Sequence, residues 1–393
     1  MDQEPGPSTS REVKKWKQKL VSTWNSVKYN GVFIRNTHKN YENRKVIHLG
    51  KIYFTHTNDT QCGFEQFFSD YYSRIWITYK TGIENFPGTT IGTDCGWGCM
   101  LRTTQMMTAQ VILHFRLGRD WRYDQQQDSK DLEILKLFED KPQSSLGVHS
   151  LIRNSVVEFG QNAGSWFAPG TSAFLMRSAI NSSSEPLIAD ISMSVSIDGL
   201  VYSEDLDVET RNWSKKLFLV VVLRFGTDKV NQVYIDGLKV LFQSPNFVGI
   251  AGGRPNHSVY FTGYSDEELI YLDPHVAKQY EPLQQSCRSY REMDPSKKEE
   301  TKHPLENFHC KLLSKMRFDS MDPSCAIGFV FGSKAEFDRT VSILNLEQVI
   351  DVDLEEGAGR KRVETPLFSV SYNARPIIDS TVIERETYDF EVL

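Results

Sequence analysis

Hydrophobic residues recur every three or four positions through the first half of the chain, a spacing that gives an α-helix one apolar face. Residues 11–28 have such a face flanked by lysines and arginines, and residues 62–80 have one built largely of aromatic side chains. Residues 99–115 are apolar on nearly every side, which is typical of a buried helix. Residues 171–181 are expected to form a further helix.

The second half of the chain changes to the pattern of β-strands. The run "LFLVVVLRF" (217–225) is rich in β-branched residues and predicts a strand covered on both faces. The segments "SVYFTGY" (258–264) and "LIYLD" (269–273) flank a polar turn and predict an antiparallel hairpin. The run "AIGFVFG" (326–332) predicts another buried strand. Helices followed by strands favour an α+β fold.

Composition and periodicity divide the chain of 393 residues into three parts. Residues 1–28 are interpreted as a disordered start followed by the basic amphipathic segment. Residues 29–349 are interpreted as one folded domain with insertions, including a polar surface loop at residues 281–305. Residues 350–393 are acidic and then mixed, lack periodicity, and are predicted to be a mostly disordered tail.

The basic segment 11–28 has two interpretations. Its tryptophans suit a helix that packs on the domain with its lysines in water, and this interpretation is preferred. The alternative is a helix that contacts anionic membrane lipids.

Charge and cysteine usage narrow the class of protein. A net charge of −6 and a pI near 5.9 argue against a nucleic-acid binder. No apolar run is long enough for a membrane-spanning helix, and the N-terminus lacks the apolar stretch of a secretory signal. Six scattered cysteines in a long chain favour a reducing compartment. A cytoplasmic location is therefore expected.

The segment "DCGWGCMLR" (94–102) holds the first candidate for chemistry. Cys99 stands where a glycine-flanked turn enters the predicted buried helix, whose start we expect Thr93 or Asp94 to cap. The free N–H groups and the dipole of a helix N-terminus stabilise a thiolate, and the same N–H groups can stabilise an oxyanion. Cys95 precedes the turn and is interpreted as a structural thiol.

The segment "YLDPH" supplies a candidate base for this thiol. Asp273 and His275 lie two positions apart, so on an extended chain they point to the same face. Asp273 can then hold one ring nitrogen of His275 and leave the other for a thiol. Pro274 cannot donate to a sheet ladder, which places the pair at a strand end or edge. Cys99, His275 and Asp273 together predict an activated nucleophile.

Two other interpretations of these residues remain open at this point. A cysteine at position 99 is equally compatible with a small buried hydrophobe. A zinc site would combine Cys95 and Cys99 with His309 and Cys310, but the spacing between the pairs is not that of known zinc motifs.

A resemblance to a known family changes this balance. Several segments resemble, in order, the signature segments of the autophagins, the autophagy-related cysteine proteases, and are closest to their animal C- and D-type members. The similarity runs from about residue 15 to about residue 345, so it covers most of the chain. The segments are "TWNSVKYN", "TDCGWGCMLRTTQMM", "GSWFAPGT", "GGRPNHSVYFTGY", "LIYLDPH", and "FHC" followed by "MDPSCAIGFVF".

The resemblance implies a fold and an activity. The fold is papain-like, with a central buried helix carrying the cysteine against a mostly antiparallel sheet carrying the Asp-Pro-His. The activity is cleavage of ubiquitin-like autophagy modifiers, of the GABARAP and light-chain-3 group, after their C-terminal glycine. This cleavage matures the precursor and also removes phosphatidylethanolamine from the lipidated modifier on membranes. No metal or organic cofactor is expected.

The resemblance also implies roles for particular residues. By the match to the family's motifs, Cys99 corresponds to the nucleophile, His275 to the base and Asp273 to the acid that orients the base. Tyr79 and the backbone N–H of Cys99 correspond to the oxyanion hole. The helical pattern of residues 62–80 suits a place for Tyr79 in the hydrophobic core equally well. Trp166 and a mobile loop at residues 252–257, with Gly252, Gly253 and Pro255, correspond to a gate over the thiol that forms a slot for a glycine tail. His257, in this loop, is expected to have a surface role.

The C-terminal residues "YDFEVL" (388–393) place Phe390 and Leu393 in an acidic context. This pattern resembles the modifier-interacting motif of autophagy proteins, which binds by strand addition. It suggests a rival function, a weakly active or autoinhibited adaptor that binds the modifier through its tail. A second rival is another thiol acyl-transfer enzyme on the same fold, such as a transglutaminase-like relative.

Overall fold

The computed structural model describes residues 41, 44–55, 60–123, 130–294, 298, 303–353 and 363–373. The predictions for residues 1–28 and for the motif containing Phe390 and Leu393 lie outside these residues and are not tested by the structure.

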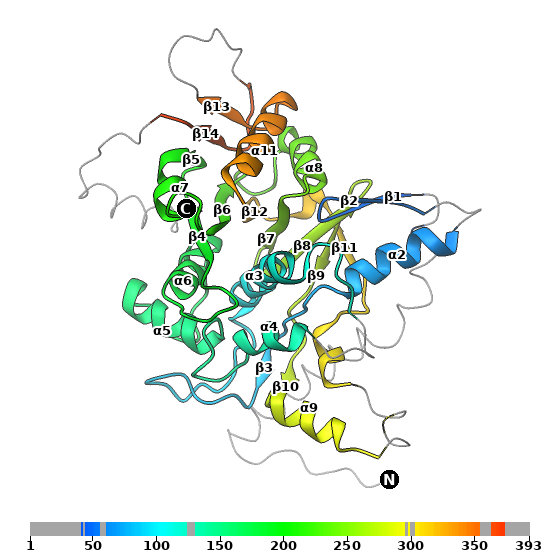
Figure 1. Cartoon of the computed structure of the whole chain (residues 1–393), viewed down its shortest axis with the longest axis vertical. Helices are drawn as coiled ribbons and strands as arrows, with labels where there is room; N and C mark the ends of the chain where they lie inside the picture. The colour runs from blue at the N-terminus through cyan, green and yellow to red at the C-terminus, as the bar shows by residue number, and fades with distance from the viewer. Residues whose placement is uncertain are drawn as a thin grey trace.

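A mixed sheet forms the centre of the molecule (Figure 1). Nine strands of the described residues belong to it, and all neighbours are antiparallel except β4 and β6. From one edge to the other the strands are β11 (Ser314–Arg317), β9 (Glu268–Leu272), β8 (His257–Ser265), β7 (Phe247–Arg254), β12 (Ser324–Phe331), β6 (Lys216–Arg224) and β4 (Ile191–Ser196). A hairpin of β1 (Lys45–His48) and β2 (Lys51–Phe54) joins the sheet where β1 pairs with β8.

Both faces of this sheet are covered, and β6 shows how. Phe218 and Val220 belong to one hydrophobic core, whereas Leu217 and Leu219 belong to the other. Helices contribute core residues on each side, so the prediction of a strand covered on both faces is confirmed. The first face carries α2 (Thr60–Tyr72), α3 (Cys99–Leu117), α4 (Asp131–Leu137), α5 (Val148–Phe159), α6 (Pro169–Asn181) and α9 (Leu283–Arg291), and the second carries α7 (Ser203–Glu209), α8 (Ile235–Gln243) and α11 (Lys334–Leu346).

Smaller elements complete the fold. Two short parallel strands, β3 (Lys80–Thr81) and β10 (Lys278–Gln279), pair beside the main sheet. A second small sheet joins β13 (Asp351–Asp353), β14 (Ser369–Ser371) and β5 (Leu200–Tyr202). Three 3₁₀ turns are η2 (Gln232–Tyr234), η3 (Pro304–Phe308) and η4 (Phe318–Ser320). Helices that precede a mostly antiparallel sheet confirm the predicted α+β class.

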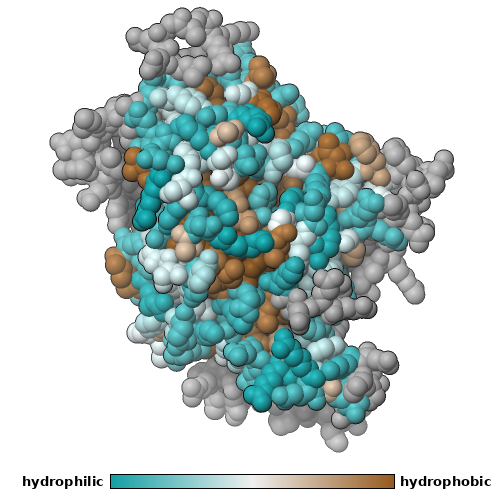
Figure 2. Space-filling view, in the orientation of Figure 1, coloured by the Kyte–Doolittle hydropathy of each residue, from teal (hydrophilic) through white to brown (hydrophobic). Residues whose placement is uncertain are grey.

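Helix α3 runs through the interior. All of its residues from Cys99 to Leu113 are buried, as the apolar pattern predicts. Figure 1 shows it near the middle of the molecule, between α6 and α2. Figure 2 shows that this face is mostly hydrophilic, with hydrophobic side chains gathered near its middle, where Figure 1 places α3.

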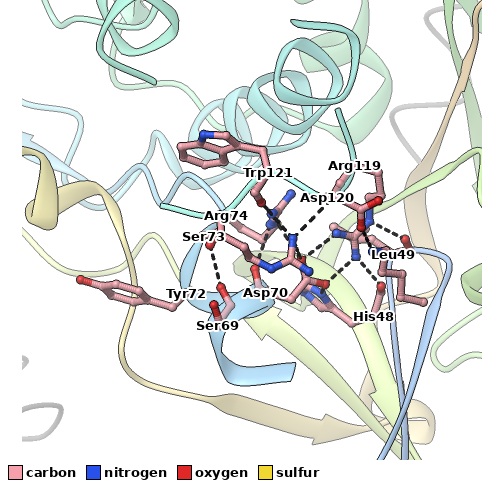
Figure 3. A network of polar contacts seen from close by, with 12 residues as sticks. His48, Leu49, Ser69, Asp70, Tyr72, Ser73, Arg74, Arg119, Asp120 and Trp121 are labelled. Atoms are coloured by element: carbon pink, nitrogen blue, oxygen red, sulfur yellow. Dashed lines mark hydrogen bonds and ion pairs between the residues drawn. The ribbon is translucent and has the colours of Figure 1, made fainter. Parts of the chain in front are cut away.

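A buried ionic network fixes α2 to the sheet and to the chain that follows α3 (Figure 3). The carboxylate of Asp70 lies 2.7 Å from Nδ1 of His48, on β1. It also accepts hydrogen bonds of 2.7 and 2.6 Å from Arg119. Arg74 and Arg122 lie within ion-pairing distance of the same carboxylate. One acid therefore holds three arginines, and its loss would leave buried positive charges without a partner.

Two segments predicted to lack regular structure contain helices or strands. Within residues 281–305, helix α9 spans Leu283–Arg291 and buries Leu283 and Cys287, so the interpretation as a loop is wrong there. Within residues 350–393, β13 and β14 pair in parallel and Val370 is fully buried, so the interpretation as a mostly disordered tail is wrong for these strands. In both cases a few buried apolar residues attach an otherwise polar segment to the domain.

The helix predicted over residues 62–80 is shorter than expected. Helix α2 ends at Tyr72. Beyond it the backbone bonds to distant segments: the N–H of Trp76 donates to Phe308 and that of Tyr79 donates to Pro274. Tyr79 is therefore extended beside the chain that follows β9, not the last residue of a helix.

No helix among the described residues is both long and apolar enough to cross a lipid bilayer.

Candidate active site

Cys99 is the first residue of α3 and its side chain is buried. The helix start differs from the prediction, because Gly98 is the N-cap and no side chain caps the helix. Asp94 instead accepts a 2.6 Å hydrogen bond from Nε of Arg102 and a 2.7 Å hydrogen bond from the N–H of Lys80. Together with the N–H of Gly98, which donates to the carbonyl of Asp94, these bonds fix the turn that presents the thiol.

The turn before Cys99 also depends on Gly96. Its φ of 87° lies in the left-handed region that glycine adopts without steric cost. Trp97 packs its ring against Phe86 and Phe167, at centroid distances of 5.4 and 6.3 Å. The loop is therefore held by packing on one side and by Asp94 on the other.

Asp273 and His275 follow directly after β9, where the sequence placed a strand end. Nδ1 of His275 lies 2.6 Å from Oδ1 of Asp273, and the His275 N–H donates to the same oxygen at 2.9 Å. Burial acts to raise the pKa of Asp273, but hydrogen bonds from His257 and His275 outweigh it and hold that pKa well below its usual range. Asp273 is therefore an ionised acceptor that orients the imidazole of His275.

The Cys99 thiol and the His275 ring act on each other's ionisation. Burial acts to raise the pKa of Cys99, but hydrogen bonds with His275 and Ser258 lower it to about 7. Burial acts to lower the pKa of His275, but hydrogen bonds with Asp273 and Cys99 raise it to about 9. Between these values the thiolate–imidazolium pair is the favoured form, because each charge stabilises the other.

Cys95, four positions earlier, has the opposite character. Burial raises the pKa of its thiol to about 11. The thiol of Cys95 thus stays protonated at neutral pH, whereas that of Cys99 ionises. Of the two neighbouring cysteines, only Cys99 has the environment of a nucleophile.

Tyr79 completes the group. Its ring meets the His275 ring edge to face, at a centroid distance of 5.3 Å and an angle of 83°. Burial, together with the neighbouring Cys99, raises the pKa of Tyr79 well above its usual range, so its hydroxyl keeps its proton. The hydroxyl is therefore a permanent donor beside the sulfur.

The comparisons with known proteins agree with this arrangement. A family model described as the peptidase C54 catalytic domain matches residues 64–343, which include every residue of the site described above. The chain belongs to this family. Its members are peptidases, and the chain is accordingly a cysteine protease.

Relatives of this peptidase are similar over most of their length. The cysteine protease atg-4.2 of Caenorhabditis elegans is 44% identical over 404 residues, which cover 97% of this chain and 77% of the relative. The cysteine protease ATG4D of Xenopus laevis is 32% identical over 415 residues, covering 92% and 82%. The human cysteine protease ATG4C is 31% identical over 407 residues, covering 84% and 85%.

Two residues of the peptidase site were not found from the sequence. Ser258, the second residue of β8, is one of the neighbours that lower the pKa of Cys99. His257 contacts the carboxylate of Asp273 and stacks on the ring of His275. The expectation that His257 has only a surface role is therefore wrong. The only signal in the sequence was their place in "RPNHS", at the end of the predicted gate.

The predicted gate is a hairpin rather than a loop. Gly252 and Gly253 belong to β7 and pair with β8, so their assignment to a loop is wrong. A Cβ on Gly253 would lie 2.1 Å from the carbonyl oxygen of His257, which explains this glycine by strand packing. Pro255 and Asn256 form the exposed two-residue turn, in which Asn256 has a φ of 60°.

Trp166 lies just before α6, and its side chain is 53% exposed. Its neighbour Phe167 packs on Trp97, so this segment lies beside the loop that presents Cys99. A role for Trp166 in covering the cleft stays a prediction.

One group among the described residues has the side chains for a metal site. Ligand atoms of His257, Asp273 and His275 all lie within 4.8 Å of one another. However, the two rings are stacked with an interplanar angle of 9°, so their in-plane lone pairs lie in parallel planes and do not converge on one point. Each carboxylate oxygen also already pairs with one ring. The arrangement is that of a hydrogen-bonded network.

Proposed function

We propose that this peptidase is a papain-like enzyme that cleaves ubiquitin-like autophagy modifiers, of the GABARAP and light-chain-3 group, after their C-terminal glycine. It would both mature the precursor and remove phosphatidylethanolamine from the lipidated form, acting in the cytoplasm. The observation that carries the proposal is the group of Asp273, His275 and Tyr79 in direct contact at the start of the Cys99 helix, in a chain similar to proteases named ATG4 over most of its length.

The proposed reaction begins when the Cys99 thiolate attacks the carbonyl carbon of the terminal glycine. The developing oxyanion would be stabilised by the Tyr79 hydroxyl and by the N–H of Cys99 at the start of α3. His275 gives its proton to the leaving nitrogen, and the C–N bond breaks to leave a thioester. His275 then takes a proton from water, which attacks the thioester and releases the glycine carboxylic acid, and the sulfur leaves as a thiolate, which restores the thiolate–imidazolium pair.

The same chemistry accounts for both proposed substrates. In the precursor and in the lipidated modifier, the bond to be broken is an amide on the carbonyl side of glycine. A glycine tail needs a narrow slot because it has no Cβ. Trp166 and the hairpin tip at Pro255 are the proposed walls of that slot.

The test uses the full-length protein with two substrates: a tagged precursor modifier and the modifier linked to phosphatidylethanolamine in liposomes. Cleavage that leaves glycine as the last residue, read by mass spectrometry, supports the proposal. Cys99→Ala should abolish cleavage of both, and the matched variant Cys95→Ala should retain it. Equal cleavage by Cys99→Ala and the parent would contradict the assigned nucleophile.

The rival adaptor function predicts a different outcome. In that case the parent binds the modifier through Phe390 and Leu393 but releases little product. Under the proposed function, deletion of residues 388–393 should weaken binding without abolishing cleavage.

A further inference from the structure

His257 stands at the beginning of β8, directly after the turn of the β7–β8 hairpin, and its side chain is 25% exposed. Its Nε2 lies 3.2 Å from Oδ2 of Asp273. The other carboxylate oxygen, Oδ1, is 2.6 Å from Nδ1 of His275. The carboxylate of Asp273 is therefore shared, one oxygen to each imidazole.

The two imidazoles also touch each other directly. Their ring centroids are 3.7 Å apart and their planes are within 9° of parallel. His257 thus covers one face of the His275 ring, while Tyr79 meets that ring edge to face. The ring that faces the Cys99 sulfur is held by Asp273, by a stacked neighbour and by a tyrosine.

We propose that His257 is a positioning residue for the His275–Cys99 pair. A carboxylate that holds an imidazole through one oxygen can still rotate about its Cβ–Cγ bond. A second donor on the other oxygen removes this freedom and so fixes the direction in which Oδ1 points. His257 thereby keeps the second ring nitrogen of His275 aimed at the sulfur.

Charge favours the same arrangement. The titratable groups that meet at this point are His257 from β8, Asp273 and His275 from the segment after β9, Cys99 from α3, and Tyr79 from the chain before β3. His257 donates from Nε2 to an ionised acid, a charge-assisted hydrogen bond. It thus helps to keep Asp273 ionised.

The inference rests on the proposed roles of Cys99 and His275, but its test needs no modifier. The rate of Cys99 alkylation by iodoacetamide follows the thiolate fraction, and mass spectrometry of the Cys99 peptide separates this thiol from the others. In the parent the rate should rise with an apparent pKa near 7. His275→Ala tests the pair itself: an unchanged profile in this variant would refute the proposed function rather than the role of His257.

Three variants separate the contacts of His257. His257→Gln keeps a donor close to the position of Nε2, His257→Phe keeps the stacked ring, and His257→Ala keeps neither. We expect His257→Ala and His257→Phe to shift the Cys99 profile upward by about one pH unit and His257→Gln to stay close to the parent. Turnover with the modifier should fall by about 10- to 100-fold in kcat for His257→Ala, with little change in KM. His114→Gln, at the far end of α3, is the matched control and should behave as the parent.

An unchanged profile in His257→Ala and His257→Phe would overturn the inference. So would a profile retained by His257→Phe but lost in His257→Gln, because stacking alone would then suffice. A measurement on the parent guards against variants that fail to fold. In ¹⁵N-histidine-labelled protein, Nε2 of His257 should carry a proton at pH values where the parent is active, and an unprotonated Nε2 there would also overturn the inference.

Discussion

The Nδ1 atom of His275 lies 2.6 Å from Oδ1 of Asp273, although only a proline separates the two residues. This contact turns the other side of the ring toward Cys99, on a different element. The raised pKa of His275 and the lowered pKa of Cys99 follow from that orientation.

The pH dependence of kcat/KM should be bell-shaped. Cys99 has a pKa of about 7, so activity should rise as the pH increases through this value and the thiolate forms. His275 has a pKa of about 9, so activity should fall as the pH increases through that value and the proton for the leaving group is lost. Initial rates at constant ionic strength measure the profile. A single rise near pH 8.5, about the value of an isolated thiol, would show that no ion pair forms.

Tyr79→Phe should lower kcat by about 10²–10³ with little change in KM, because it removes one donor to the oxyanion. The Phe ring retains the packing against His275, so the free energy of unfolding should hardly change. Tyr372→Phe removes a hydroxyl that bonds Asp338 on α11 and serves as the control, with the activity of the parent. An unchanged kcat in Tyr79→Phe would leave the tyrosine with a packing role only.

Asp70→Asn should lower the free energy of unfolding by about 3–5 kcal/mol, because it leaves the positive charges of Arg74, Arg119 and Arg122 without their common partner. Urea unfolding at neutral pH measures this loss. Asp120→Asn, at an acid that is 82% exposed, should change stability by about 0.5 kcal/mol or less. A similar small effect for both variants would mean that the network of Figure 3 adds little to stability.

Phe368→Ala should lower the free energy of unfolding by about 3–5 kcal/mol, because the ring is buried in the core beneath the small sheet of β13, β14 and β5. Leu346→Ala, at a side chain that is 72% exposed on α11, is the control and should have little effect. Thermal or urea unfolding compares the two. If Phe368→Ala and Leu346→Ala had the same free energy of unfolding, the C-terminal segment would not contribute to the stability of the domain.

The strands and the buried helix were predictable because their signals are local. The continuous β-branched run of β6 and the apolar sequence of α3 follow from residues next to one another in the chain. The short spacing of Asp273 and His275, with a proline between them, likewise placed both at a strand end. For these features, periodicity carries enough information by itself.

The missed features depend on contacts between distant segments. Helix α9 buries only Leu283 and Cys287, and β14 has three residues that pair in parallel with β5, so neither has a periodic pattern of its own. The end of α2 is set by backbone bonds to residues beyond position 270. His257 joins the site through the pairing of β8 with β9, and sequence alone does not specify which side chains that register brings to Asp273.

Cys99 lies on the interior helix, whereas the imidazole that activates it follows a strand of the sheet and is added to the chain long after the thiol during synthesis. While the ribosome has yet to add His275, the sulfur is an ordinary, unreactive thiol. Hydrolytic competence thus arrives only when the sheet forms and carries His275 to the sulfur.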